Sequence, residues 1–140
     1  MPKILYVLLP LAVLAIVAAY FLLAGDNQPQ EPVGVSQATP EEAWPIIKAG
    51  GNVVLLDVRT PEEFNQQHVP GSRLLPLAPP PEFTAEAHRL LPDKNTAIYV
   101  ICRSGRRSQI AAEILAADGY KKVSNLGGII DWPYETTSSE

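Results

Sequence analysis

The sequence contains little cysteine and histidine, and this scarcity excludes several classes of site. Its 140 residues include one cysteine, Cys102, and two histidines, His68 and His88. A single cysteine forms no intramolecular disulfide, and a dithiol oxidoreductase would need a second, resolving cysteine nearby. The two histidines lie far apart in the sequence, without a second cysteine or an acidic cluster, so no metal-ligand spacing is present. We therefore expect neither a metal nor another cofactor.

Positive charge is also scarce. Eleven lysines and arginines stand against fifteen acidic residues, which gives a formal net charge of −4 and a sequence pI near 5.2. This balance argues against nucleic acid as a partner. With 46% hydrophobic and 19% charged residues, the composition fits one globular domain with an appendage. We expect the chain to be a monomer.

Charged residues are absent from Ile4 to Ala24. A helix of this length spans about 30 Å, the hydrocarbon thickness of a bilayer. We therefore expect residues 1–25 to form one transmembrane anchor helix, followed by a polar linker over residues 26–32. Lys3 precedes the apolar segment and the next basic residue is Lys48, so the positive-inside rule places Met1 in the cytoplasm and the domain on the periplasmic side of the inner membrane. The alternative is a signal peptide, whose cleavage would release the domain into the periplasm.

Helical and extended patterns alternate after the linker. Thr39-Pro40-Glu41-Glu42 and Thr60-Pro61-Glu62-Glu63 are capping boxes that start two helices, and Pro45 should kink the first helix or force a restart. An apolar helical face follows a stiff connector over residues 79–81, and another helix ends at Gly119. The expected strands are residues 33–35, 53–58, 74–77, 97–101 and 123–126.

This alternation predicts an α/β domain over residues 33–134. Strands separated by helices imply right-handed crossovers and a mostly parallel sheet of about five strands, with helices on both faces. The tail, residues 135–140, is expected to be disordered.

The only cysteine lies where a strand is expected to end and a helix to begin. The apolar run from Ala97 to Ile101 leads into Cys102-Arg103-Ser104-Gly105-Arg106-Arg107, after which a helical pattern continues. The first amides of a helix lack intrahelical partners, and the helix dipole is positive at that end. With three arginines beside it, the thiol should be shifted toward thiolate. The loop therefore combines a nucleophile with an anion site.

Each feature of this loop also has a simpler interpretation. A lone cysteine at a strand end is usually a small buried hydrophobe, and a run of arginines is usually a solvated face. Their coincidence in one turn at the carboxyl end of a strand, where open α/β sheets bind ligands, favours a site. A phosphatase or arsenate reductase loop would need Cys-x5-Arg, but that offset holds Ser108, and the arginine falls one position earlier at Arg107. The shorter loop should leave room for a sulfur atom and cramp a tetrahedral phosphate.

Three stretches, in the right order, resemble the rhodanese family of single-domain sulfurtransferases. The loop over residues 102–107 fits the family pattern Cys-Arg-x-Gly-x-Arg/Thr at every fixed position. Residues 56–64 with His68-Val69-Pro70-Gly71 resemble the amino-terminal signature, and residues 119–132, with Gly127-Gly128 and Trp132, resemble the carboxy-terminal segment. The resemblance covers about Val33 to Tyr134.

The resemblance implies a thiosulfate sulfurtransferase. Cys102 would take the outer sulfur of thiosulfate or a similar donor as a persulfide, and cyanide or a thiol would remove it, with ping-pong kinetics. The loop amides would form a nest around the transferred sulfur, and the arginine side chains would hold the anionic donor. Two alternatives remain open: a persulfide carrier, and a non-catalytic rhodanese-like module that binds a partner or senses redox state. The implied substrate-binding residues are Arg103, Ser104, Gly105, Arg106 and Arg107.

The remaining residues of the three stretches have structural interpretations. Asp57 and Arg59 resemble charged family positions near the active site and are candidate supporting residues, but we expect them chiefly to pair and so satisfy a buried carboxylate. Glu63 should complete a capping box. Gly127 and Gly128 should form a turn that needs positive φ or close packing, and Trp132 should fill the core.

Overall fold

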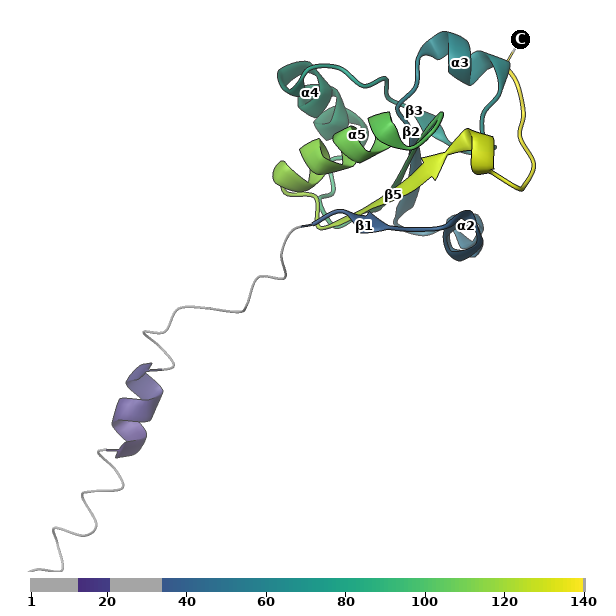
Figure 1. Ribbon diagram of the computed structural model, residues 1–140. Coiled ribbons are helices and arrows are strands. Elements are labelled where there is room, and N and C mark those ends of the chain that lie inside the picture. Colours follow the sequence, from purple (N-terminus) through teal and green to yellow (C-terminus); the bar gives the residue numbers. More distant parts are fainter. Residues whose placement is uncertain (1–12, 21–33, 140) are drawn as a thin grey trace, which may run out of the picture. The chain divides into compact units, whose positions relative to one another are not determined.

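The computed structural model describes residues 13–20 and 34–139, and the chain divides into two units, Met1–Pro32 and Val33–Glu140. In the first unit, residues 13–20 form a helix with exposed side chains (Figure 1). Within the described ranges, no helix has both the length and the apolar character needed to cross a bilayer. The predicted anchor over residues 1–25 lies mostly outside the described residues, and the predicted linker over 26–32 lies wholly outside them.

The second unit alternates strands and helices along the chain (Figure 1). Its five strands lie in the order β1-β5-β4-β2-β3, and every neighbouring pair is parallel. This arrangement confirms the predicted α/β class with a parallel five-stranded sheet. The elements are β1 (Ser36–Gln37), α2 (Pro40–Ala49), β2 (Val53–Asp57), α3 (Pro61–Gln66), β3 (Arg73–Leu74), α4 (Pro80–Leu90), β4 (Ala97–Cys102), α5 (Arg106–Ala117), β5 (Lys122–Gly128) and the 3-10 helix η1 (Ile129–Asp131).

The central strand β4 explains why this part of the sequence is continuously apolar. Successive side chains of a strand point to opposite faces of the sheet. Ile98, Val100 and Cys102 belong to one buried cluster, while Tyr99 and Ile101 belong to the other. Because helices cover both faces, both sets of side chains are withdrawn from water, as expected for a parallel sheet.

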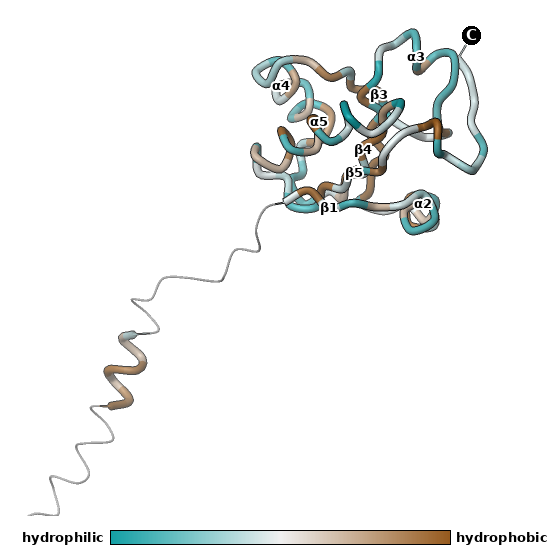
Figure 2. Tube along the Cα trace, viewed as in Figure 1, coloured by the Kyte–Doolittle hydropathy of each residue, from teal (hydrophilic) through white to brown (hydrophobic). Residues whose placement is uncertain are grey.

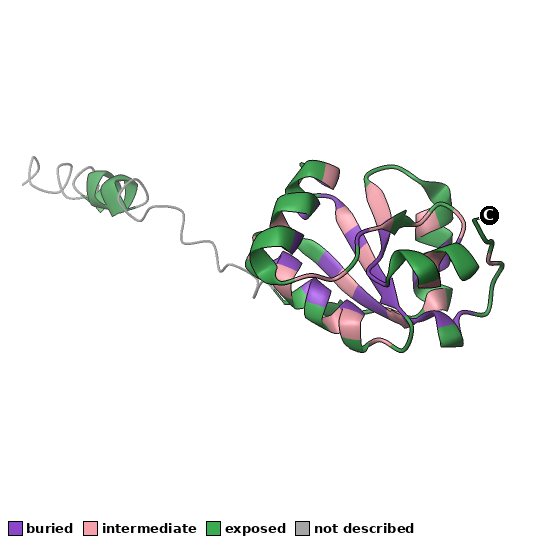
Figure 3. Cartoon of the chain, turned by 90° about the horizontal axis from the view of Figure 1, so that it is seen from above, coloured by how far each residue is buried: buried purple, intermediate pink, exposed green. Residues whose placement is uncertain are grey.

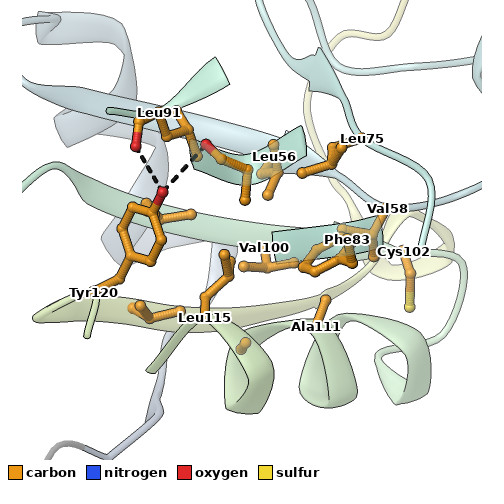
Figure 4. Packing of buried hydrophobic residues seen from close by; sticks show 14 residues of the cluster. Leu56, Val58, Leu75, Phe83, Leu91, Val100, Cys102, Ala111, Leu115 and Tyr120 are labelled. Carbon is orange, nitrogen blue, oxygen red and sulfur yellow. Dashed lines mark hydrogen bonds between the residues drawn. The ribbon is translucent and has the colours of Figure 1, made fainter. Parts of the chain in front are cut away.

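Each face of the sheet has its own layer of helices. Phe83 of α4 and Leu115 of α5 join the first cluster, in which Figure 4 shows them near Val100. Trp44 of α2 joins the second cluster. Figure 3 shows the strands as largely buried and the outer faces of the helices as exposed, and Figure 2 shows the central strands among the most hydrophobic parts of the domain. Full burial of a side chain such as Phe83 stabilises the fold by about 1.5–3 kcal/mol.

Tyr120 joins the two helices of the first face. It is fully buried, and its hydroxyl donates to the carbonyl oxygens of Leu91 (2.6 Å) and Ala87 (3.2 Å) (Figure 4). The segment that follows α5 is thereby fixed to the end of α4. This contact positions α5, whose first residues flank the cysteine.

The two predicted capping boxes are present. Thr39 begins α2 and Thr60 begins α3, each with a reciprocal hydrogen-bond pair to the glutamate three residues later and with proline at the first helical position. Pro45, predicted to kink or restart the first helix, lies inside α2, which runs continuously over ten residues.

Some element bounds differ from those predicted. The first described strand is residues 36–37; residues 34 and 35 of the predicted strand over 33–35 do not belong to it, and residue 33 lies outside the described residues. β3 is residues 73–74, not 74–77, although the amides of Leu75 and Leu77 still donate to the carbonyl oxygens of Asp57 and Val58. The predicted connector over residues 79–81 is wrong in part, because α4 begins at Pro80. The first helical positions need no amide donor, so proline is tolerated there.

The tail predicted to be disordered returns to the domain instead. His68 and Thr137 form an antiparallel bridge in which each amide donates to the other carbonyl oxygen at 2.8 Å, and the Ser139 amide donates to the Asn65 carbonyl oxygen. Tyr134 stacks on Trp44 with ring centroids 5.9 Å apart. Backbone hydrogen bonds at Thr137 and Ser139 therefore hold the tail against the domain, which its polar composition did not indicate.

Candidate active site

The cysteine loop follows β4 at the point where the sheet reverses its direction of growth. β2 and β4 are neighbours, but the chain leaves β2 for β3 at one edge and leaves β4 for β5 on the opposite side. Loops that diverge in this way leave a crevice at the carboxyl ends of the strands, where open α/β sheets bind ligands. The topology therefore brings the segment after Asp57 beside the loop that begins at Cys102.

Glycines give this loop its shape. Gly105 has a φ of 98°, in the left-handed region, and immediately precedes α5. Gly128 lies against the loop so closely that a Cβ at this position would meet the Arg103 carbonyl oxygen at 2.1 Å. Gly127 has a φ of 91°. The predicted reasons for the glycine pair, positive φ and close packing, are thus both confirmed, one at each residue.

The sulfur of Cys102 is buried within this loop. The residue is 1% exposed, and its Sγ accepts the Gly105 amide at 3.0 Å. Burial raises the pKa of the thiol, but hydrogen bonds from Ser108 and from the amides of Ser108, Gly105 and Ser104 outweigh it, so the pKa lies below its usual value. The lowered pKa agrees with the sequence prediction. Its main cause is hydrogen bonding at the start of α5 and not the arginine charges.

The three loop arginines have different environments. Arg107 forms a bidentate pair with Glu63, with both N–O distances at 2.7 Å. This pair holds the pKa of Glu63 at about 2, against an ordinary 4.5, and raises that of Arg107. Among the described residues, Arg103 and Arg106 have no carboxylate within ion-pair distance, and both are exposed. Arg107 is therefore already paired with a carboxylate, and its predicted role in holding the anionic donor stays a prediction.

Asp57 and Arg59 form the buried pair that the sequence predicted. Their side chains are almost fully buried, and Arg59 Nη2 lies 2.7 Å from Asp57 Oδ2. Arg59 also donates to the carbonyl oxygens of Glu63 and Gln67. The pair thus connects the end of β2 to Glu63 within α3 and to Gln67 at its C-terminus, and Glu63 is also the partner of Arg107.

Sequence reasoning missed two polar residues beside the sulfur. Ser108, the third residue of α5, lies 3.4 Å from Cys102 Sγ through its Oγ, and it donates to Asn125 Oδ1 at 2.7 Å. Asn125 is a buried polar residue in β5. An asparagine within the strand predicted over residues 123–126 was the available signal, because a buried amide needs nearby partners.

A cavity of about 650 Å³ opens beside the loop. Arg103 and Ile130 line it from the loop side and from η1, and the returning tail lines it from the other side. Trp132 is absent from the lining; it is 8% exposed and packs edge-to-face on Trp44, in agreement with its predicted place in the core. No group of three or more potential metal ligands occurs within residues 13–20 and 34–139. The remaining lining residues are Arg59, Glu63, Gln66, Gln67, Ile129, Thr136, Thr137 and Ser138.

Comparison with known proteins agrees with this geometry. The rhodanese-like domain family matches residues 39–134. The thiosulfate sulfurtransferase PspE of Escherichia coli K12 is 45% identical over 76 residues, which cover 54% of this chain and 70% of PspE. YrkF of Bacillus subtilis 168, named as a candidate sulfur carrier protein, is 33% identical over 113 residues, or 80% of this chain and 58% of YrkF. The chain thus spans less than two thirds of the length of YrkF.

A solved structure has the same fold. A rhodanese from Escherichia coli, determined with anions, superposes with a TM-score of 0.55 at 36% sequence identity, covering 61% of this chain and 98% of that chain. The match to the family spans every element from α2 to η1, with the cysteine loop among them. The chain belongs to the rhodanese-like domain family.

Proposed function

We propose that this chain is a sulfurtransferase that carries a sulfur atom on Cys102 as a persulfide. The observation that supports this most strongly is the position of the Cys102 sulfur, which is buried at the start of α5 and accepts the Gly105 amide at 3.0 Å. Amide donors in this arrangement stabilise a thiolate and, equally, the terminal sulfur of a persulfide. Relatives named as thiosulfate sulfurtransferases support the same chemistry.

The proposed first half-reaction takes sulfur from thiosulfate. The Cys102 thiolate attacks the outer sulfur, a new S–S bond forms, and the bond to the sulfite sulfur breaks with its electron pair on the leaving sulfite. One thiolate and one dianion become one persulfide anion and one sulfite dianion, so atoms and charge balance without a proton. Transfer to a nucleophile on the enzyme in this way is covalent catalysis.

In the second half-reaction an acceptor removes the sulfur. Cyanide attacks the terminal sulfur, thiocyanate leaves, and the electron pair of the broken S–S bond returns to Cys102 as thiolate. A thiolate acceptor gives a new persulfide in the same way. Sulfite departs before the acceptor reacts, so the kinetics should be ping-pong.

Arg103 and Arg106 are the proposed contacts of the anionic donor. Both are exposed arginines of the loop without a carboxylate partner among the described residues. Two unpaired guanidinium groups match the double charge of thiosulfate through charge-assisted hydrogen bonds. Arg107 is neutralised by Glu63 and serves the loop as a structural cation.

A persulfide carrier is the second candidate, and the similarity to YrkF favours it. Such a protein would accept a sulfur atom from a partner protein and turn over thiosulfate poorly. The full-length chain, assayed for thiocyanate with thiosulfate and cyanide, distinguishes the two. Sustained turnover with parallel double-reciprocal plots supports the enzyme. Loading by a persulfide donor without turnover supports the carrier, and no loading at all indicates a non-catalytic module.

We also propose that the apolar segment from Ile4 to Ala24 anchors the domain on the periplasmic side of the inner membrane, with signal cleavage as the alternative. The absence of charge in the segment and the position of Lys3 before it support this orientation. Because membrane-impermeant thiol reagents are bulky and Cys102 is buried, topology is better tested with Glu62→Cys in a Cys102→Ser background, since Glu62 is exposed. A membrane-impermeant thiol reagent should label it in intact spheroplasts. Labelling only after lysis would contradict the orientation.

A further inference from the structure

We infer that Ser108 and Asn125 are positioning residues for Cys102, and that the Ser108 hydroxyl turns between the sulfur and Asn125 as the charge on the sulfur changes. The inference rests on the proposed function. It concerns a row of buried groups: Cys102 and Ser108 are 1% and 0% exposed, and Asn125 is 7% exposed. Water is therefore excluded from the contacts, and each polar atom depends on its protein partners.

The orientation of the Asn125 amide is fixed by the backbone. The Gly127 N–H, which can only donate, lies 3.0 Å from Asn125 Oδ1. On its other side, Asn125 Nδ2 donates to Gln109 Oε1 at 3.0 Å. The β4–β5 register shifts here, since Asn125 pairs with Val100 and Gly127 pairs with Ile101. Asn125 therefore holds this irregularity and presents an oxygen to Ser108.

The Ser108 hydroxyl has one proton and more than one acceptor. At 2.7 Å from Asn125 Oδ1, which carries no proton, the hydroxyl must be the donor. When Cys102 is a thiol, its S–H can donate to Ser108 Oγ at 3.4 Å, and all three groups are satisfied. When Cys102 is a thiolate, the sulfur becomes an acceptor, and the Ser108 hydroxyl can donate to it beside the amides of Ser108, Gly105 and Ser104. Asn125 Oδ1 keeps the Gly127 amide as a donor, so the hydroxyl is free to turn.

This rotation follows the charge through the reaction. Before sulfur uptake the negative charge lies on Cys102 Sγ, and the hydroxyl points to it. In the persulfide the charge lies on the terminal sulfur, Sγ is a neutral divalent atom, and the hydroxyl returns to Asn125. When the acceptor removes the outer sulfur, Sγ leaves as thiolate and the hydroxyl again donates to it. Ser108 thus stabilises Sγ in the states where it is charged.

Other groups near the sulfur also act on its charge, but none substitutes for this donor. The Gly105 amide reaches Sγ from the loop. The charged groups around the site are either paired with each other or exposed on the loop, so substitution of Ser108 changes no charge. They are the Arg107–Glu63 pair, the Asp57–Arg59 pair, Arg103 and Arg106.

The test is the pH dependence of Cys102 alkylation by iodoacetamide in the purified full-length chain. Ser108→Ala should raise the pKa of the thiol by about one to two units, because it removes a hydrogen bond to a charged group, and alkylation below that pKa should slow by about tenfold to a hundredfold. Ser108→Thr, which keeps a hydroxyl, should restore most of the effect. Ser124→Ala removes a half-buried serine hydroxyl from the same strand as Asn125 and should leave the pKa unchanged.

A folded Ser108→Ala variant with an unchanged thiol pKa, or a folded threonine variant that restores nothing, would overturn the inference. If Ser108→Ala fails to fold, Asn125→Leu decides instead, because it removes the competing acceptor without adding a charge. The Ser108 proton should then serve the sulfur more fully and lower the pKa of Cys102, and an unchanged or raised pKa would contradict the rotation. Sulfur uptake from thiosulfate is measured separately by mass spectrometry. A wild type that takes up no sulfur refutes the proposed function, whereas the pKa of Cys102 in the variants tests the role of Ser108 independently.

Discussion

The bidentate pair of Arg107 and Glu63 offers the sharpest single test of how the loop is held. We predict that Glu63→Gln lowers the free energy of unfolding at neutral pH by about 1–2 kcal/mol. Glutamine at the third helical position still completes a capping box with Thr60, so the change isolates the ion pair. The chain supplies a matched control, since Glu42 occupies the same position in the capping box of α2 but pairs with no arginine among the described residues. Glu42→Gln should change stability little.

The magnitude follows from the pKa of Glu63. The hydrogen bond from Arg107 is the largest cause of the fall in this pKa from 4.5 to about 2; burial opposes the fall, and hydrogen bonds from Thr60 and the charge of Arg107 add to it. A shift of this size corresponds to about 3 kcal/mol at most. The side chains of Arg107 and Glu63 are 33% and 28% exposed, so solvent screening reduces the contribution of the ion pair to about 1–2 kcal/mol.

The pH dependence has a definite sign. Because the folded pKa lies below the unfolded one, the ion pair stabilises the protein fully above about pH 4.5, and this stabilisation is lost as the pH falls through about 2. Urea unfolding of the full-length chain, followed by the fluorescence of Trp44 and Trp132, measures the free energy of unfolding at each pH. The difference between wild type and Glu63→Gln should shrink over that window. Equal costs for the two glutamine variants at pH 7, or a Glu63 cost that persists at pH 2, would refute the reasoning.

Three further predictions concern the loop itself. Arg103→Ala and Arg106→Ala should each lower kcat/KM for thiosulfate by about tenfold to a hundredfold through loss of a charged hydrogen bond. Both variants should use a neutral persulfide donor nearly as well as the wild type does. A larger loss in Arg107→Ala would contradict the assignment of that arginine to Glu63. Gly128→Ala should lower the free energy of unfolding by about 1–3 kcal/mol and displace the loop, since its Cβ would meet the Arg103 carbonyl oxygen at 2.1 Å. A variant with the thermal stability and the Cys102 alkylation rate of the wild type would argue against this contact. An alanine inserted after Gly105 creates the Cys-x5-Arg spacing and should abolish sulfur transfer, and retention of full activity would show that loop length does not select for sulfur.

The cysteine loop and the sheet could be predicted because their signals are local. Helix starts at Thr39 and Thr60 follow from four-residue capping boxes, both present in the structure. The apolar run before Cys102 predicts a strand covered on both faces. The alternation of expected strands with helices along the chain predicts the parallel sheet of five strands. The glycine pair near the end of the domain also indicated its two constraints, positive φ and close packing.

The contacts that tune the loop could not be predicted, because they join residues far apart in the sequence. Glu63 lies 44 positions before Arg107, and its capping-box role gave no reason to expect a second partner. Ser108 and Asn125 are 17 positions apart, on a helix and a strand that meet only in the folded domain. The bridge between His68 and Thr137 joins a segment that composition describes as a polar tail. Each of these three contacts forms between segments that meet only in the folded domain, so the local sequence did not indicate it.

The mass of the intact chain after incubation with thiosulfate tests the central claim most directly. Wild-type protein, separated from excess thiosulfate, should gain the mass of one sulfur atom, localised to the peptide that contains Cys102, and cyanide should remove it with release of one equivalent of thiocyanate. Cys102→Ser should gain nothing while keeping the wild-type melting temperature, because the change is nearly isosteric. A wild type that stays unmodified, or a serine variant that still forms thiocyanate, would contradict a persulfide on Cys102.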